Sequence, residues 1–222
     1  MLEDALPKGD KEQIRILEVG LGYGVLATCA SDYGSVTAIE HPSREYMYNR
    51  AYLDFFHKRR IQLIAADITS GFPFKDNTFN LVLFCDIWEH IDPQLLPGIM
   101  EEIKRILKPT GHLIISTPNL ARLENRIKFL SGKSPNPPFP APLYGKTYGH
   151  IREYTLSEIT AFLKRLGFSI TAAKIRILPV FEQTKPSRIP AREVTKLLFP
   201  SFGDEIYLAT EKTEVAPDFW TG

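Results

Sequence analysis

Short apolar runs alternate with longer mixed segments over the first half of the chain. The apolar runs occur at 14–19, 35–40, 61–66, 81–85 and 112–116, and each has the composition of a buried strand. Residues 25–32, 44–58 and 93–107 have helical composition or spacing, and Asp92 is the expected N-cap of the last of these helices. This repeated strand–helix unit predicts a parallel sheet with right-handed crossovers, and hence an α/β fold.

The pattern changes after residue 118. Residues 119–130 are helical and basic in composition, and the five prolines within 131–148 exclude a helix or a central strand there. A loop of this length in a compact domain often covers a functional site. A capping box at Thr155–Glu158 opens a helix that runs to Leu166 and is closed by Gly167. Strands are expected at 169–178 and 205–210, and a short helix at 191–198. We expect a single domain over 1–222, with a proline-rich cover segment at about 120–150.

The first apolar run ends in Glu18 and is followed by Gly20, Gly22 and Gly24. Glycines in such a turn let the backbone approach a ligand at the carboxyl end of the first strand, where open α/β sheets bind cofactors. The dinucleotide pattern G-x-G-x-x-G needs a third glycine at position 25, where Val25 stands. The G-x-G-x-G spacing after an acid resembles motif I of the class I S-adenosylmethionine-dependent methyltransferases.

Two more acids follow strand ends, Glu40 after the second strand and Asp67 after the third. A carboxylate in Glu40's position can accept both hydrogen bonds of a ribose diol, and Asp67 can accept from an adenine amino group. Glu18 can meet the cationic end of a methionine moiety. Each acid alone is better explained as a solvated loop residue, but three around one glycine turn favour a nucleotide-like ligand.

The resemblance covers about the first 120 residues and includes the segments 74–84 and 102–119. It implies a three-layer Rossmann-like methyltransferase fold with a seven-stranded, mostly parallel sheet and one antiparallel strand near the edge. It also implies S-adenosylmethionine as cofactor. The expected cofactor-binding residues are Glu18, Gly20, Gly22, Gly24, Glu40, Asp67, Ile68 and Cys85.

The residues that follow the fourth strand are candidates for the chemistry. If the strand turns into a helix, Asp86, Glu89 and His90 share one face, and His150 follows the proline-rich segment. Two carboxylates and two imidazoles can bind a divalent metal, Mg or Zn. The stretch is similar to that of two metal-dependent groups, the ubiquinone-pathway O-methyltransferases and the small-RNA 3′-terminal ribose methyltransferases, which implies these four residues as ligands. Asp86 is shorter than the glutamate usual at the first position.

Two other interpretations of this cluster stay open. In a metal-free reaction His90 or His150 is the general base, assisted by Glu89, because imidazole titrates near neutral pH. Alternatively, Glu89 and His90 only cap a helix.

Composition narrows the function classes. The net charge of +1 gives no strong electrostatic attraction for nucleic acid. Cys29 and Cys85 form no CxxC pair, and no signal peptide or membrane-length apolar run is present, so we expect a cytoplasmic protein. The basic segment 122–133 allows peripheral contact with a membrane or a lipid-linked acceptor.

The expected function is therefore O-methylation of a small molecule, lipid quinone or glycan hydroxyl. The alternatives are a terminal-ribose methyltransferase that acts on nucleic acid and a non-enzymatic cofactor-binding protein. The intact glycines and acids argue against the last, and nothing in the sequence names the acceptor.

Overall fold

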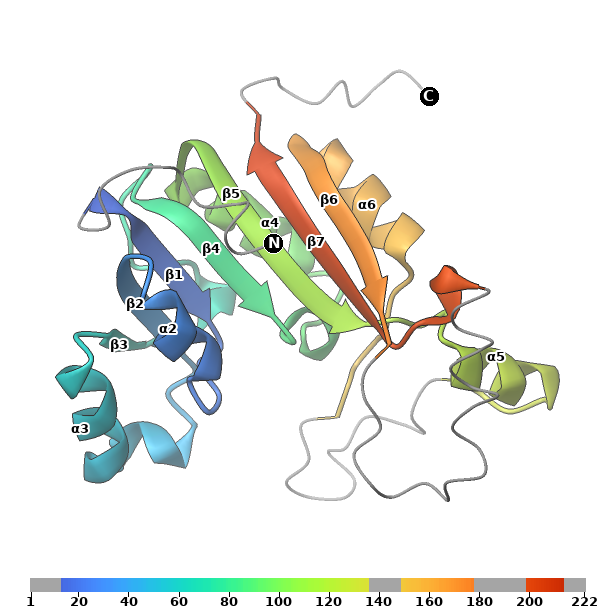
Figure 1. Ribbon diagram of the computed structural model, residues 1–222, viewed down its shortest axis with the longest axis horizontal. Helices are drawn as coiled ribbons and strands as arrows, with labels where there is room; N and C mark the ends of the chain where they lie inside the picture. Colours follow the sequence, from blue (N-terminus) through green and yellow to red (C-terminus); the bar gives the residue numbers. More distant parts are fainter. Residues whose placement is uncertain (1–12, 136–148, 178–198, 214–222) are drawn as a thin grey trace.

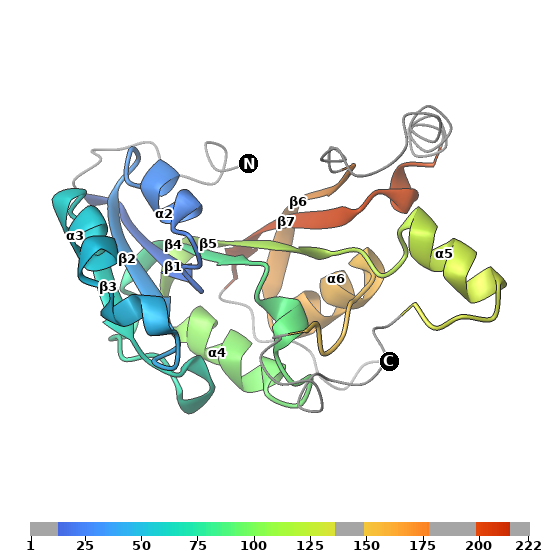
Figure 2. The same cartoon turned by 90° about the horizontal axis from the view of Figure 1, so that it is seen from below.

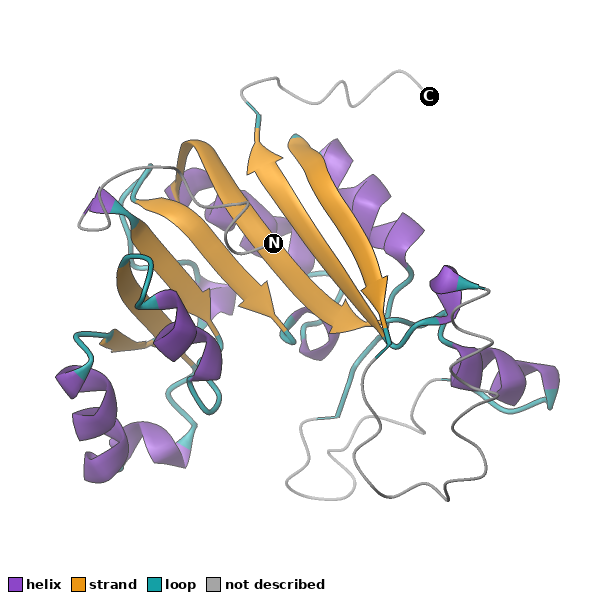
Figure 3. Cartoon of the chain, viewed as in Figure 1, coloured by secondary structure: helices purple, strands orange, loops and turns teal. Residues whose placement is uncertain are grey.

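The computed structural model describes residues 13–135, 149–177 and 199–213, which build one mixed sheet flanked by helices (Figures 1 and 3). The sheet has seven strands in the order β3-β2-β1-β4-β5-β7-β6. In chain order the strands are β1 (Arg15–Val19), β2 (Ser35–Glu40), β3 (Gln62–Ala65), β4 (Phe79–Cys85), β5 (Leu107–Pro118), β6 (Phe168–Arg176) and β7 (Glu205–Lys212).

One strand runs against the others, as expected. The pairs β1–β2, β2–β3, β1–β4 and β4–β5 are parallel, whereas β7 is antiparallel to both β5 and β6. The chain order reverses at β1, from which the sheet grows outward through β2 on one side and β4 on the other. Ligands of open α/β sheets bind at the carboxyl ends of the strands at such a switch point, so the fold places the candidate cofactor residues at a ligand-binding edge.

The helices lie on both faces of the sheet (Figure 2). Helices α4 (Leu96–Ile106) and α6 (Leu156–Arg165) cover one face, α2 (Val25–Ala30) lies on the other, and α3 (Arg50–Lys58) lies beside the β3 edge. Helix α5 (Leu123–Leu130) stands away from the sheet beyond the end of β5. Short 3₁₀ helices complete the described elements: η2 (Glu45–Tyr48), η3 (Ile68–Ser70), η4 (Trp88–His90) and η7 (Pro200–Phe202).

Strand residues alternate between two apolar cores, as the two-residue period of a strand requires. Leu17 and Val19 of β1 pack in the core under α4 and α6, whereas Ile16 packs in the core under α2 and α3. Helix α4 contributes its buried face at helical spacing, through Leu96, Ile99, Met100, Ile103 and Ile106. These two cores make the expected three-layer architecture.

Several element boundaries differ from the expected ones. The helix expected at 93–107 begins at Leu96, and Asp92 accepts from the Gln94 amide (2.9 Å) instead of capping it. The helix expected at 44–58 is divided at Asn49, whose backbone is extended and whose side chain caps α3. The helix expected from residue 119 begins at Leu123.

The capping box of α6 is present as expected, with Thr155 and Glu158 bonding reciprocally. Most of the proline-rich loop (136–148) and the short helix expected at 191–198 lie outside the described residues. Within the described part of the chain, no helix is both long and apolar enough to cross a membrane.

Candidate active site

The glycine turn after β1 has the left-handed backbone that only glycine adopts without strain. Gly20, Gly22 and Gly24 have φ values of 77°, 51° and 70°. A Cβ atom on Gly20 would lie 2.0 Å from the Ile87 side chain, and one on Gly24 2.1 Å from Phe56, whereas a Cβ on Gly22 would meet nothing within 4 Å. Packing therefore requires glycine at the outer two positions, and Gly22 leaves open space beside the turn.

Glu18 is a buried carboxyl next to this turn, with 3% of its surface exposed. One hydrogen bond reaches it from the backbone of Ala27 in the first turn of α2, and its Oε2 has no partner among the described residues. Burial, and secondarily the charge of Glu40, raise the pKa of Glu18 to about 8. A cation placed against Oε2 would offset the cost of ionising this carboxyl.

Glu40, at the end of β2, holds the glycine turn from the neighbouring strand. Its Oε2 accepts from the Gly22 amide (3.2 Å) and from the Tyr46 hydroxyl (2.8 Å), and its Oε1 accepts from the His41 amide (2.7 Å). Tyr52 donates to the Gly22 carbonyl (2.7 Å). The aromatic residues from η2 and α3 were not expected to contact the turn.

The other expected cofactor residues follow β3 and β4. Asp67 has a side chain that is 41% exposed, and it caps η3 by accepting from the Thr69 amide (2.9 Å); Ile68 begins that turn. The hydrogen bonds from Thr69 hold the pKa of Asp67 below its usual value. Cys85 ends β4, and burial raises the pKa of its thiol to about 12, so the thiol stays neutral.

A second cluster joins η4 to the segment before α6. Glu89, His90 and His150 offer one ligand atom each, and these atoms lie within 4.8 Å of one another. Glu89 Oε1 is 3.9 Å from both His90 Nε2 and His150 Nε2. The Glu89 carbonyl also accepts from the Ile151 amide (2.7 Å). This hydrogen bond holds His150 beside η4, although the two segments are distant in sequence.

Burial shifts the pKa values of two members of this cluster, Glu89 and His90. Glu89 is 1% exposed, and burial raises the pKa of its carboxyl despite a 2.9 Å hydrogen bond from Thr117. Burial, with a smaller contribution from the charge of His150, lowers the pKa of His90, which favours its neutral form. A neutral imidazole offers a lone pair to a metal ion or a proton.

Glu153 supports this cluster and was not expected from the sequence. It is 3% exposed and lies 3.1 Å from His150 Nδ1 through Oε1. Burial alone would raise its pKa, but the hydrogen bonds and charge of Arg122 outweigh that effect and hold the pKa below its usual value. The sequence feature that could have indicated this role is the position of Glu153, three residues after the candidate histidine His150.

Asp86 does not join the other candidate ligands. Its backbone is left-handed (φ 54°), and its carboxylate accepts from Ser116 Oγ (3.0 Å) and lies in hydrogen-bonding contact with Glu205. Burial, and secondarily the charge of Asp86, raise the pKa of Glu205 to about 7. The expected shared face of Asp86, Glu89 and His90 is absent because the chain turns at Asp86 and then forms a 3₁₀ helix.

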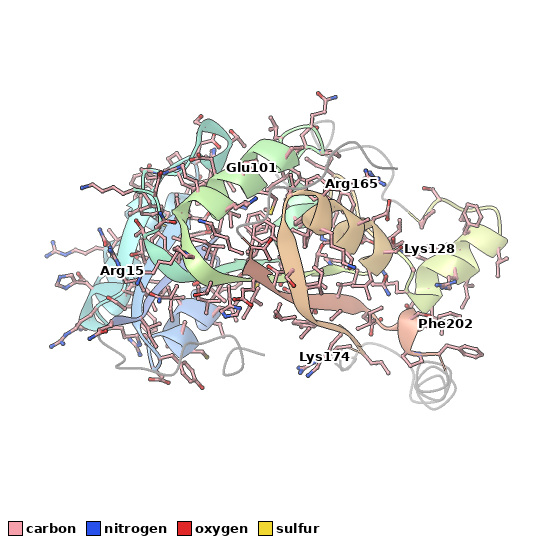
Figure 4. The ribbon with its side chains drawn as sticks, turned by 90° about the horizontal axis from the view of Figure 1, so that it is seen from above. Arg15, Glu101, Lys128, Arg165, Lys174 and Phe202 are labelled. Atoms are coloured by element: carbon pink, nitrogen blue, oxygen red, sulfur yellow. The ribbon has the colours of Figure 1, made fainter. Side chains whose placement is uncertain are left out.

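An apolar groove of about 510 Å³ lies along α5. Lys128 of α5 and Phe202 of η7 lie at the same end of the molecule, away from Arg15 (Figure 4). Arg126 stacks over the Phe202 ring at 4.4 Å. The apolar lining comes mainly from Leu120, Leu123, Ile127, Phe129, Leu130 and Phe202.

Curated relatives match about half of the chain. An uncharacterized protein of Methanocaldococcus jannaschii is 31% identical over 110 residues, which are 50% of this chain and 43% of that protein. A sterol 4-C-methyltransferase of Caenorhabditis elegans is 28% identical over 106 residues, 47% of this chain and 31% of that protein. The chain thus aligns with less than half the length of either relative.

Solved structures share the whole fold. An S-adenosylmethionine-dependent methyltransferase of Methanosarcina mazei gives a TM-score of 0.67 at 17% identity, covering 95% of this chain and 96% of that one. One from Mesorhizobium loti gives 0.62 at 17% identity, covering 95% of both chains. At these identities the likeness establishes the fold, and it confirms the expected Rossmann-like methyltransferase architecture.

A family model described as a methyltransferase domain matches residues 2–173. That range includes the glycine turn, the acids at the strand ends and the Glu89–His90–His150 cluster. The chain therefore belongs to the methyltransferase domain family, an enzyme family, as the glycine turn predicted.

Proposed function

We propose that this protein transfers a methyl group from S-adenosylmethionine to a hydroxyl group of a small, largely apolar acceptor. The observation that carries the proposal is the convergence of Glu89 Oε1, His90 Nε2 and His150 Nε2 at the ligand-binding edge of the sheet. Oxygen acceptors need a proton removed or a metal ion to polarise them, and this cluster can serve either route.

The residues around the glycine turn fit the cofactor. Bound S-adenosylmethionine supplies a methyl group on a positively charged sulfur. Gly22 leaves the space that a close ligand needs, and the unpartnered Oε2 of Glu18 would pair with a cationic group. Glu40 and Asp67 remain our candidates for the ribose and adenine groups.

The histidines would take the proton of the acceptor hydroxyl. His90 and His150 are about one-third exposed, so an acceptor can reach them, while Glu89 behind them is buried. A neutral imidazole Nε2 accepts the proton as the acceptor oxygen bonds to the methyl carbon, and the carbon–sulfur bond breaks. The electron pair of the broken carbon–sulfur bond would stay on the cofactor's sulfur, which would become a neutral thioether.

The same three side chains are suited to a metal ion. Two imidazoles and one carboxylate favour Zn²⁺ over Mg²⁺, which prefers oxygen ligands and water. Two zinc ligands at a tetrahedral angle are about 3.3 Å apart. Glu89 Oε1 is 3.9 Å from each Nε2 atom, and the three ligand atoms lie within 4.8 Å of one another, so the side chains would move closer together on a bound ion. A metal ion there would lower the pKa of a hydroxyl bound in its open position.

The groove along α5 supports an apolar acceptor. Its volume of about 510 Å³ lies in the range of small-molecule sites, and its lining is mainly aliphatic and aromatic. This composition favours a phenol or a lipid quinol over a sugar. A terminal-ribose substrate is the second candidate because the Glu89–His90–His150 cluster suits it too, but the net charge of +1 gives little attraction for RNA.

The test uses methyl-labelled S-adenosylmethionine with three acceptor sets: apolar phenols and quinols, glycans, and RNA with a free 3′ ribose. We expect label on the first set, and loss of turnover with retained cofactor binding in the variants Glu89→Ala and His90→Ala. His57→Ala on α3 is the matched histidine control. Label on RNA would favour the second candidate, and full activity in the double variant Glu89→Ala/His90→Ala would refute the assignment.

Removal of metal separates the two routes. If a metal ion takes part, chelation abolishes transfer and zinc restores it in the wild type. If His90 or His150 acts alone as the base, chelation leaves the rate unchanged, while alanine in place of the acting histidine still abolishes transfer.

A further inference from the structure

A buried hydrogen-bonded chain connects the start of α5 to His150. The Glu153 carboxylate is 3% exposed and is contacted on both oxygens. Arg122 Nη2 donates to Oε1 (3.0 Å) and Arg122 Nη1 donates to Oε2, where Asn125 Nδ2 also donates (3.1 Å). His150 Nδ1 is 3.1 Å from Oε1.

The contact to His150 determines which imidazole nitrogen carries the proton. A carboxylate paired with arginine is ionised and only accepts hydrogen bonds, so Nδ1 of His150 must be the donor. The lone pair of a neutral His150 then lies on Nε2, the atom that faces Glu89 Oε1 at 3.9 Å. A histidine side chain in water, with no such acceptor at Nδ1, prefers the Nε2–H tautomer.

We propose that Glu153 is a positioning residue that holds His150 in the Nδ1–H tautomer with Nε2 available to the site, and that Arg122 and Asn125 fix Glu153 from α5. The proposal rests on the proposed function only for what Nε2 does next, as metal ligand or base. Ligand histidines commonly donate their second N–H to a carboxylate, and loss of that partner typically costs about 10–100-fold in metal affinity or activity.

The same contacts connect the groove along α5, the proposed acceptor site, to the Glu89–His90–His150 cluster. Asn125 lines the groove along α5 and also donates to Glu153, and the Leu120 carbonyl accepts from its amide (3.0 Å). A change in the position of α5 therefore changes the contacts that orient His150.

The test compares the wild type with Glu153→Gln, which keeps the size of the side chain and removes its charge. Long-range ¹H–¹⁵N correlation spectra of ¹⁵N-histidine-labelled protein, recorded above the pH at which imidazole is protonated, report the tautomer of His150. We expect Nδ1–H in the wild type and a shift toward Nε2–H in the variant. Zinc titration of the protein alone should show about 10–100-fold weaker binding in the variant.

The matched control is Glu102→Gln on α4, because Glu102 also forms a two-point pair with an arginine, Arg105 (both contacts 2.8 Å). This control should leave the tautomer of His150 and the zinc affinity unchanged. If Glu153→Gln does not fold, Arg122→Lys keeps the charge and should give a smaller shift in the same direction. Glu153→Asp should restore part of the zinc affinity.

The proposal is overturned if wild-type His150 is in the Nε2–H form, or if Glu153→Gln leaves both the tautomer and the zinc affinity as in the wild type. The proposed function fails separately, when the wild type has the Nδ1–H tautomer but transfers no methyl group to any hydroxyl acceptor. The spectra need no acceptor, so the two failures are distinguishable.

Discussion

Single residues at the glycine turn divide into those that packing requires and those that a ligand requires. Gly20 and Gly24 are closed in by Ile87 and Phe56, whereas Gly22 faces open space and Glu18 keeps one oxygen without a partner among the described residues. An unpartnered buried carboxyl oxygen does not stabilise the turn, and the carboxyl costs free energy to ionise. Open space and a buried acid next to each other therefore support a cationic ligand.

Substitutions of the glycines should separate these roles. We expect Gly24→Ala to unfold the protein or lower its stability by several kcal/mol, because a Cβ would overlap the Phe56 ring. Gly22→Ala should cost only about 1–2 kcal/mol for its left-handed backbone, yet reduce cofactor affinity at least tenfold. Thermal unfolding and calorimetric titration measure both effects, and unchanged affinity in Gly22→Ala would contradict this role.

Glu18 should couple cofactor binding to proton release. Its pKa of about 8 in the free protein means that the carboxyl is mainly protonated at pH 7, and a bound cation stabilises the ionised form. Binding at pH 7 should therefore release up to one proton and tighten as the pH rises toward 8. Titrations in buffers of different ionisation enthalpy measure the release, and Glu18→Gln should show none and bind more weakly.

At the scale of elements, local signals in the sequence explain most of the helices and strands, and the exceptions have local causes. The capping box placed the start of α6 correctly because both of its hydrogen bonds lie within one turn. Asp92 instead caps a turn that precedes α4, and extended backbone at Asn49 divides one expected helix in two. In both places the side chain accepts from a single backbone amide, and the sequence does not show which amide that is.

Loss of the α6 cap should be measurable. We expect Thr155→Ala to lower the free energy of unfolding by about 0.5–2 kcal/mol, because the Glu158 amide loses its acceptor. Thr160→Ala, the same change in the interior of α6, should be neutral or slightly stabilising, since alanine is the better helix former. Equal losses in the two variants, measured by denaturant unfolding, would show that the cap contributes nothing.

At the scale of the whole molecule, one edge of the sheet gathers several buried acids. Glu18, Glu89 and Glu205 come from three segments distant in sequence, and burial raises the pKa of each. Glu18 lies near the end of β1 and Glu89 follows β4, whereas Glu205 begins β7, which is antiparallel, so all three belong to the same edge of the sheet. The free protein keeps these carboxyls at a cost in stability, as expected of a site built for ligands.

This cost should appear in the pH dependence of stability. Glu18 and Glu205, with pKa values of about 8 and about 7, stay protonated in the folded protein where the unfolded chain has lost the protons. The unfolded state then binds fewer protons, so stability falls as the pH rises from about 5 to about 8, by on the order of 1–4 kcal/mol for each carboxyl. Thermal melts across this range should flatten in Glu18→Gln/Glu205→Gln, and an equally steep profile in that variant would refute the assignment.

Hydrophobic period and glycine spacing are local properties, so they were enough to predict the order of strands and helices along the chain, the glycine turn and the acids at strand ends. The sequence also identified Glu89, His90 and His150 by residue type. The position of His150 beside Glu89 became visible in the three-dimensional structure, where backbone hydrogen bonds hold the distant segment 151–152 against Glu89. The contacts of Asp86 with Ser116 and of Glu153 with Arg122 were also visible only in the folded chain. Backbone dihedrals and contacts between distant elements decide where these side chains point.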